Sequence, residues 1–279
     1  MDLKILAETP PWEWPEDVDR MLLSILTDGR ADADDRILAA DLAGDFSVIN
    51  DALVDALLTI LQNRDESEEM RGTAAVSLGP VLEYTGTDGF DDLDDDNPVS
   101  AATIDHIQKS LRRLYTDAGV PEDVRRRILE ASVRSRQDWH QDAVRAAWSG
   151  KDPEWRLTAV FAMRWVGGFE NQILEALKSD DPDVHYEAVC AAGAWGLDGA
   201  WPHVSKLIES KTTDKELLLA AIEAAVNIQP REAGMLLADL TDSEDQDIAD
   251  TAYEAMIMAA GISEDGFDDD EEYDEEYDT

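Results

Sequence analysis

The stretch that decides the fold occurs twice, as Asp152-Pro153-Glu154-Trp155-Arg156 and, 29 residues later, as Asp181-Pro182-Asp183-Val184-His185. The Asp in each copy is an expected helix N-cap, because its carboxylate accepts hydrogen bonds from unpaired backbone N–H groups. The Pro fits the first helical position, and the acid after it suits the positive end of the helix dipole. Alanines three residues apart follow in both copies and lie on one helix face, which lets a neighbouring helix approach closely. Each copy therefore predicts the start of a packed helix.

The same frame continues along the chain, with looser copies towards both ends. Its fifth position falls at Arg36, Arg71, Arg125, Arg156, His185, Leu218 and Ala249. Successive copies are 29 to 35 residues apart, except for a gap of 54 residues between Arg71 and Arg125, which contains an acidic insertion. A Gly or Pro break follows most of these first helices, and a second amphipathic helix follows the break. This period predicts a stack of helical hairpins, none of which could bury its apolar face alone.

At this point the chain resembles HEAT-repeat proteins of the short bacterial kind, which are also seen among phycobilin-lyase-like proteins. The resemblance covers residues 30–261 and is most specific at residues 152–210. It implies an all-α fold, an α-solenoid of about six to seven HEAT-like hairpins in a right-handed superhelical stack. Residues 1–29 are expected to hold an N-terminal capping helix, 86–99 an acidic loop, and 262–279 a disordered acidic tail. Such a fold hosts many functions, so it implies no particular one.

The charge is strongly negative, with 64 acidic against 23 basic side chains and a formal net charge of −41. Such a surface repels phosphate backbones and anionic lipids, so we expect neither nucleic acid nor a membrane as a partner. The acidity has three open explanations, which are solubility, recruitment of a basic partner, and adaptation to a salty cytoplasm. The start of the chain lacks the pattern of a signal peptide, and no apolar stretch approaches the length of a membrane helix. We therefore expect a cytoplasmic protein.

No catalytic or metal-binding constellation stands out. The four histidines are scattered and none precedes a Glu, whereas the di-iron hydroxylases that resemble this fold use repeated His-Glu pairs. We expect His185 to join a polar ladder between repeats, and Cys190 to be a buried, inert thiol. The acidic loop lacks the ligand spacing of an EF-hand, and no phosphate-binding glycine loop is present. We therefore predict no catalytic residue, no metal and no cofactor.

The remaining signal points to recognition of another protein. A basic island between Lys109 and Arg136 carries eight bases against four acids in an otherwise acidic chain. In HEAT relatives the second helices line the concave face, and Trp and Arg are frequent binding hot spots. The candidate partner-binding residues are Arg112, Arg113, Arg126, Arg127, Trp139, Arg145, Trp148 and Trp201. The alternative is that the tryptophans pack between repeats as core, while Arg125 and Arg156 pair with an Asp of an adjacent repeat.

We therefore predict a non-enzymatic scaffold or adaptor that binds another protein, one whose acidic segment docks on the basic island. The chain's own acidic loop or tail could instead cover Arg112, Arg113, Arg126 and Arg127, because the charges are opposite. Two alternatives stay open. One is a lyase or chaperone-like protein that acts on a prosthetic group, as the resemblance to bilin lyases implies. The other is an acidic decoy or antidote that captures a basic protein.

Overall fold

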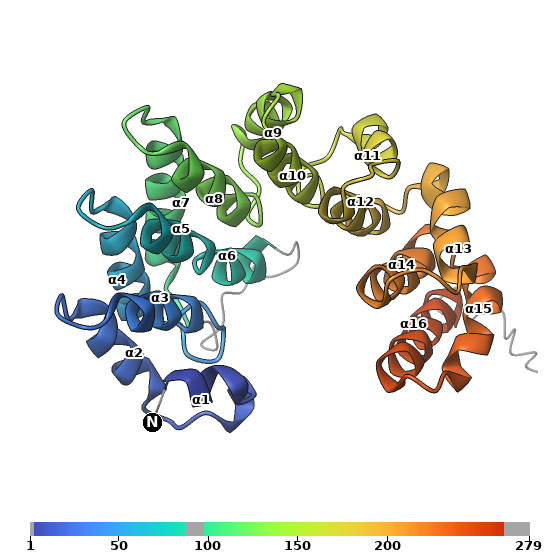
Figure 1. Ribbon diagram of the computed structural model, residues 1–279, viewed down its shortest axis with the longest axis horizontal. Helices are drawn as coiled ribbons and strands as arrows, with labels where there is room; N and C mark the ends of the chain where they lie inside the picture. Colours follow the sequence, from blue (N-terminus) through green and yellow to red (C-terminus); the bar gives the residue numbers. More distant parts are fainter. Residues whose placement is uncertain (1–2, 87–97, 265–279) are drawn as a thin grey trace, which may run out of the picture. The chain divides into compact units, whose positions relative to one another are not determined.

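The computed structural model describes residues 3–86 and 98–264, which form α-helices and short 3₁₀ helices without a strand among them (Figure 1). This confirms the expected all-α class. None of the helices in the described residues has the length and apolarity that crossing a membrane requires.

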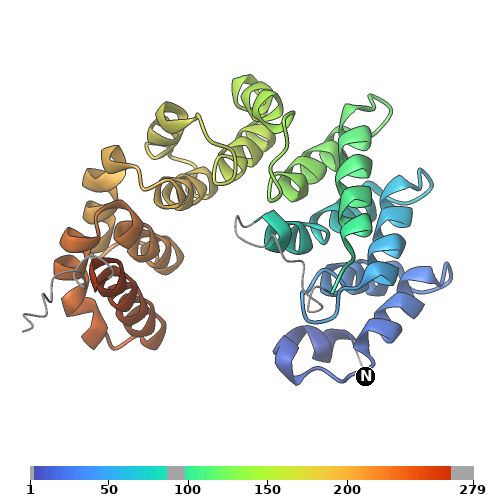
Figure 2. The same cartoon turned by 180° about the vertical axis from the view of Figure 1, so that it is seen from behind.

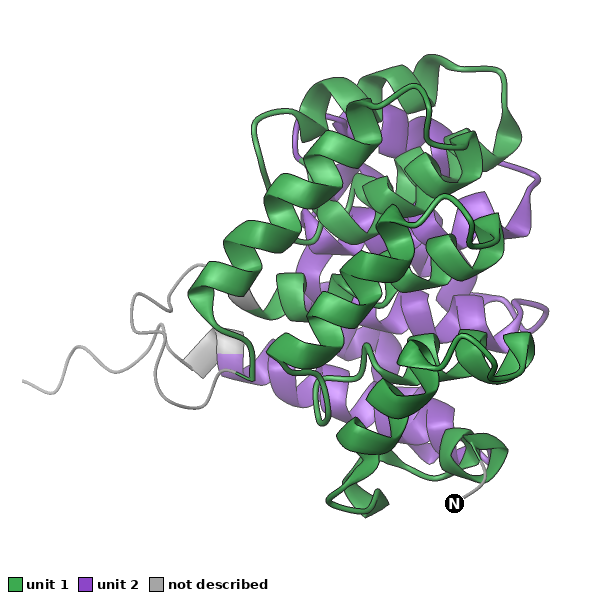
Figure 3. Ribbon diagram, turned by 90° about the vertical axis from the view of Figure 1, so that its left-hand side faces the viewer, with its two compact units in different colours: residues 1–166 green, residues 167–279 purple. Residues whose placement is uncertain are grey.

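The chain divides into two compact units, Met1–Val166 and Gly167–Thr279 (Figure 3). Unit 1 contains α1 (Leu3–Glu8), η1 (Pro11–Glu13), α2 (Val18–Thr27), α3 (Ala33–Leu42), α4 (Asp51–Gln62), α5 (Glu68–Val76), α6 (Gly79–Gly86), α7 (Ala101–Thr116), α8 (Glu122–Ser132), α9 (His140–Ser149) and α10 (Pro153–Ala162). Unit 2 contains α11 (Glu170–Ala176), α12 (Pro182–Ala194), η2 (Asp198–Ala200), α13 (Trp201–Glu209), α14 (Lys215–Ile228), α15 (Pro230–Leu237), η3 (Ala238–Asp242) and α16 (Gln246–Glu264). The repeat region predicted over 30–261 is thus shared between the two units.

The N-caps predicted from the repeat are present. Asp152 accepts from the backbone N–H groups of Glu154 and Trp155 at 2.8 and 3.4 Å. Asp181 caps α12 in the same way, and Asp32 and Asp214 cap α3 and α14. Each cap satisfies a backbone donor that the helix itself leaves unpaired.

The sequence pattern suggested that each hairpin consists of a first helix, a break and the second helix that follows it. The structure pairs the helices differently. Each tightly packed hairpin joins a second helix to the first helix of the next repeat, because the capped turn between them is short. The hairpins in the described residues are α2–α3, α4–α5, α7–α8, α9–α10, α11–α12, α13–α14 and α15–α16. The Asp cap therefore lies inside a hairpin rather than at its start. Within each unit these hairpins stack as the repeat predicted.

Within each unit the helices form two layers, which Figures 1 and 2 show from opposite sides. In unit 1 the first helices α3, α5, α8 and α10 pack in succession, and α2, α4 and α7 form the second layer. In unit 2, α12, α14 and α16 pack in succession, while α13 packs against α15. Leu, Ile, Val and Ala side chains fill the space between the layers of unit 1.

Two glycines near the end of α12, Gly193 and Gly196, have different roles. Gly196 has a φ of +54°, which is the left-handed turn conformation that favours glycine. Gly193 instead lies inside α12, and a Cβ there would be 2.7 Å from the Cα of Ala224. Gly193 therefore permits the close approach of α12 and α14.

The predicted segment boundaries change in three places. Residues 1–29 contain a further helix, α1, which packs on α3. Val99, expected at the end of the acidic loop, is buried. Helix α16 continues to Glu264, three residues into the predicted tail. The remainder of the loop, 87–97, and of the tail, 265–279, lies outside the described residues.

Candidate functional site

Two arginines of the predicted basic island lie on α7, each with a polar partner of its own. Arg112 forms an ion pair with Asp138 at 3.1 Å, and Arg113 donates to the amide oxygen of Gln62 at 2.8 Å. Both side chains belong to the second-helix layer of unit 1, where they face solvent. Exposed pairs of this kind contribute little to stability.

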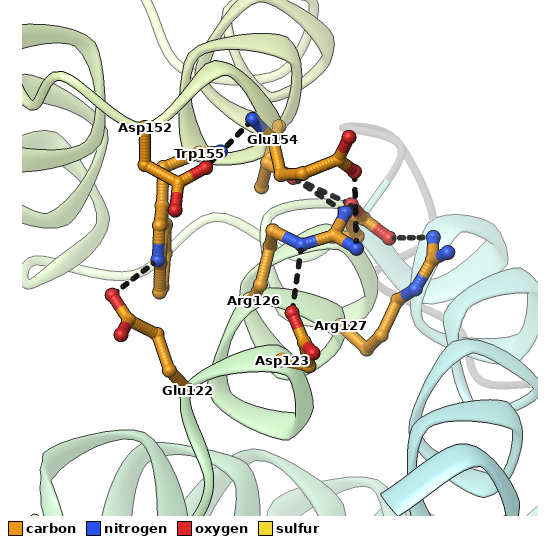
Figure 4. A network of polar contacts seen from close by, with 9 residues as sticks. Glu122, Asp123, Arg126, Arg127, Asp152, Glu154 and Trp155 are labelled. Carbon is orange, nitrogen blue, oxygen red and sulfur yellow. Dashed lines mark hydrogen bonds and ion pairs between the residues drawn. The ribbon is translucent and has the colours of Figure 1, made fainter.

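Arg126 and Arg127 lie on α8, in the other layer of unit 1, at the centre of a polar network (Figure 4). Arg126 is buried, with 7% of its surface exposed, and its guanidinium lies 3.0 Å from Glu130 and 3.5 Å from Glu154. The hydroxyl of Thr158 on α10 donates to the same Glu130 carboxylate at 2.6 Å. Arg127 forms an ion pair with Glu130 at 2.7 Å.

The sequence analysis offered Arg126 as a partner-binding residue, whereas the structure buries it and pairs it within the fold. The Arg126 side chain points inward between α8 and α10. Its guanidinium forms ion pairs with Glu130 of its own helix and with Glu154 of the next repeat. Only Arg127 of this pair keeps a substantially exposed side chain, and Glu130 neutralises it. The basic island is therefore not a free cationic surface where these two residues lie.

The other candidates are dispersed and mostly packed. Trp139 is half-buried against Tyr115 and His140, with ring centroids 4.8 and 4.1 Å away. Trp148 lies under the guanidinium of Arg156 at 4.2 Å, and the exposed Arg145 pairs with Asp142. Trp201 begins α13 in unit 2, so the structure does not gather the eight residues into one described site.

Two arginines at the fifth repeat position, Arg36 and Arg71, reach back along their own hairpin. Arg71 donates to the backbone carbonyl of Leu61 at 2.9 Å, and Arg36 donates to that of Leu26 at 3.4 Å. Both carbonyls belong to the last turn of the preceding helix, where backbone acceptors are unpaired and the dipole is negative. Arg36 also pairs with Glu66 of the following repeat at 2.7 Å. At Arg36 and Arg71 the repeat arginine thus caps the preceding helix, and Arg36 adds an ion pair with a Glu. The pairing of Arg125 and Arg156 with an Asp of an adjacent repeat stays a prediction.

A strongly acidic hollow opens on the first-helix layer of unit 1, which we call hollow A. It has a cavity volume of about 560 Å³. Its lining consists of Glu68, Ala118, Gly119, Val120, Pro121, Glu122, Asp123, Asp152, Glu154 and Trp155. Five of these residues are carboxylates and none is basic. The indole N–H of Trp155 donates to Glu122 at 2.8 Å and so fixes the ring at the wall of the hollow (Figure 4).

A second hollow, hollow B, follows the valley between α5 and α8. Its cavity volume is about 480 Å³, and it shares Glu68 and Asp123 with hollow A. The remaining lining residues are Asp41, Glu69, Gly72, Thr73, Val76, Arg126 and Arg127. The two arginines are paired with carboxylates, as described above, so they leave hollow B short of free positive charge.

The carboxylates of hollow A come together because α5, α8 and α10 lie side by side with their first turns at the same edge. Glu68, Asp123 and Glu154 all lie in such first turns. The partial positive charge of each helix N-terminus offsets part of their mutual repulsion. The sequence analysis interpreted Glu154 as a partner of its own helix dipole and did not single out Glu68 or Asp123. The repeat period itself was the signal that could have placed them along one edge.

Three of the four histidines, His140, His185 and His203, have contacts within the fold. His140 is fully buried, accepts from the N–H of Gln137 at 3.0 Å and contacts the hydroxyl of Ser132 at 3.2 Å. Burial lowers the pKa of His140 to about 4, which keeps the imidazole neutral. His185 contacts His203 within unit 2, where a polar ladder had been predicted. No group of three or more His, Cys, Asp or Glu residues suited to a metal occurs in 3–86 or 98–264.

Comparisons with known proteins find similar folds but no family. No protein-family model and no curated relative matches the chain. The structure is similar to that of Escherichia coli YibA, with 17% identity and a TM-score of 0.46 over 88% of this chain and 84% of that one. It is also similar to human deoxyhypusine hydroxylase in complex with glycerol, with 15% identity and a TM-score of 0.41 over 90% and 87% of the two chains. The stacked hairpins of each unit carry the fold assignment by themselves.

Proposed function

We propose that this protein is a non-enzymatic scaffold that binds a positively charged segment of another protein through the first-helix layer of unit 1. The observation that carries the proposal is hollow A, where five carboxylates and a fixed indole surround a space without a basic residue. Such a hollow lowers the electrostatic potential for an entering cation, because fixed charges of one sign add within a concave site. An Arg or Lys side chain of the partner would bring positive charge into hollow A, whose lining contains no basic residue.

The partner differs in charge from the acidic one expected on the basic island. Arg112, Arg126 and Arg127 already form ion pairs, and an acidic segment would have to displace a carboxylate from each of them. Arg126 is in addition buried, so displacement there would uncover a charge within the layer. At hollow A, Asp123 and Glu154 lie 3.9 and 3.5 Å from Arg126, and a cationic partner adds its charge to a site with five carboxylates in its lining. The geometry thus favours capture of a basic segment, which the sequence had left as an alternative.

The test uses short dye-labelled peptides rich in Arg and Lys, with Glu-rich and Ser-rich peptides of the same length for comparison. Binding to the full chain is followed by fluorescence anisotropy. The main variant combines Glu68→Gln, Glu69→Gln and Glu122→Gln, which remove charge from hollows A and B while leaving Trp155 an amide oxygen to donate to. We expect the basic peptide to lose about tenfold or more in affinity.

A matched variant removes the same charge elsewhere in unit 1, through Glu16→Gln, Asp17→Asn and Asp55→Asn. All three residues are exposed, and none lines a hollow described here. We expect this variant to bind the basic peptide within about twofold of the natural chain, because exposed charges beyond a Debye length are screened. An equal loss in both triple variants, or tighter binding of the Glu-rich peptide, contradicts the proposal.

A further inference from the structure

A third hollow of unit 1, hollow C, adjoins hollow B, so that hollows A, B and C together form one groove. Its cavity volume is about 330 Å³. Its lining consists of Ala7, Thr9, Pro11, Trp14, Asp41, Leu42, Gly44, Asp45, Val76, Ser77, Pro80 and Arg134. Hollow C shares Asp41 and Val76 with hollow B, which in turn shares two residues with hollow A. The three hollows therefore adjoin one another from the first turn of α5 to the residues after its end.

The two ends of this groove differ in chemistry. Hollow A is lined by carboxylates and one indole, whereas hollow C adds the apolar side chains of Trp14, Leu42 and Val76 and two proline rings to the carboxylates of Asp41 and Asp45. The one basic residue in hollow C is Arg134, which forms an ion pair with Glu83 at 2.5 Å. Its guanidinium also lies 5.4 Å from the ring centroid of Phe161. Arg134 is thus held by its own neighbours and does not turn hollow C into an anion site.

Helix α5 sets the distance between the two ends. Glu68 and Val76 are its first and last residues, and a rise of about 1.5 Å per residue separates them by about 12 Å. An extended chain advances about 3.3 Å per residue, so the same distance corresponds to about four residues of an extended segment. A segment with a cation at one end and an apolar side chain about four residues away matches both ends of the groove at once.

We propose that the groove binds an extended segment of another protein that places one or two Arg or Lys side chains in hollow A and an apolar side chain in hollow C, about four residues apart. This inference rests on the proposed function, because it specifies the occupant of the same face. The acidic hollow supplies attraction and orientation, since charge complementarity mainly sets encounter and register. Burial of the apolar side chain supplies the contact that salt does not screen.

The experiment compares dye-labelled peptides that carry two Arg residues and a Leu about four positions away, in both chain orders because the groove fixes no direction. Companion peptides replace Leu by Ser, replace both Arg by Ser, or bring Leu next to the Arg pair. We expect the bipartite peptide in one order to bind the full chain at least about fivefold more tightly than the Leu→Ser peptide. At raised salt, the Leu contribution should persist while the Arg contribution weakens.

A substitution in the protein locates the apolar contact. Val76→Thr keeps the side-chain shape but places a hydroxyl where hollows B and C meet, so it should reduce the advantage of the Leu peptide. Val48→Thr is the control, because Val48 is partly buried in unit 1 and lines none of the three hollows. It should leave that advantage unchanged.

The outcomes separate this inference from the proposed function. If the Leu and Ser peptides bind equally, the proposal of a bipartite segment is overturned. If affinity is still lost when Glu68, Glu69 and Glu122 are neutralised, the proposed binding of a basic segment stands. An advantage for Leu that Val48→Thr abolishes and Val76→Thr does not also overturns the placement in hollow C. Absence of binding by every Arg-containing peptide overturns both proposals.

Discussion

His185 on α12 and His203 on α13 meet with their Nε2 atoms 2.6 Å apart and their ring centroids 4.9 Å apart. The distance between the ring centroids exceeds the distance between the Nε2 atoms by about twice the radius of an imidazole ring. The two Nε2 atoms therefore point directly at one another. One imidazole donates an N–H and the other accepts it, and the space between them holds a single proton. This hydrogen bond connects two successive helices of unit 2 only while the pair is not fully protonated.

The His pair predicts that unit 2 loses stability in mild acid. Burial lowers the pKa of both histidines, and the charge of Lys206 lowers that of His203 further. Because the unfolded chain binds protons near pH 6.5 and the folded pair resists them, stability is present above about pH 6.5 and is lost as pH falls below it. His203→Gln keeps a donor to His185 and removes one titrating group. Urea unfolding between about pH 7.5 and 5.5 should show a smaller loss for this variant, and an unchanged loss contradicts the prediction.

The buried His140 makes a contribution of the same sign. With a folded pKa of about 4 and an unfolded value near 6.5, its neutral form stabilises the fold fully above about pH 6.5. Between about pH 7.5 and 5, this residue alone costs about 2 kcal/mol of unfolding free energy. His140→Gln should flatten that dependence, although the variant starts from a lower stability. Urea unfolding of both chains over this pH range measures the difference, and an equally steep fall for His140→Gln contradicts the prediction.

The close approach of α12 and α14 predicts that Gly193→Ala is destabilising. The new Cβ would lie 2.7 Å from a backbone Cα of Ala224, so a helix must move, at a cost of about 1–3 kcal/mol. Gly234→Ala on α15 is the matched change, because a Cβ there meets nothing within 4 Å. It should be neutral or stabilising by up to about 1 kcal/mol, since Ala is the better helix former. Thermal unfolding distinguishes the two, and equal effects would contradict the packing described.

The polar network between α8 and α10 predicts a cost for Thr158→Val. Thr158 is fully buried and donates to Glu130 at 2.6 Å, while Glu130 also holds Arg126 and Arg127. Valine keeps the shape but leaves the carboxylate short of a donor, at an expected cost of about 1–3 kcal/mol. Thr116→Val at the exposed end of α7 should stay within about 0.5 kcal/mol. A neutral Thr158→Val variant would show that the network does not stabilise the junction of the two helices.

The sequence alone determined the helix starts and the stacking of hairpins, because both depend on local chemistry repeated at a fixed period. Asp152 and Asp181 cap their helices wherever those helices lie, since the bonded N–H groups are two and three residues away. The apolar period determined which faces are buried. The partner of each helix within a hairpin was assigned wrongly, because the pattern marks helix starts and breaks but not which of two neighbouring helices packs more closely.

Only the tertiary structure determined which charged side chains form ion pairs and which line a common hollow. Arg126 and Arg127 are adjacent in a basic run, yet Arg126 points inward between α8 and α10 and Arg127 lies at the surface. Both pair with Glu130. Glu68 and Glu154 are 86 positions apart in the chain and line one hollow, because α5, α8 and α10 pack in succession. Charge interactions depend on distance in space, which stacking sets and composition does not contain. The sequence therefore specified an acidic stack of helices, and only the packing of unit 1 turned its acidity into a groove.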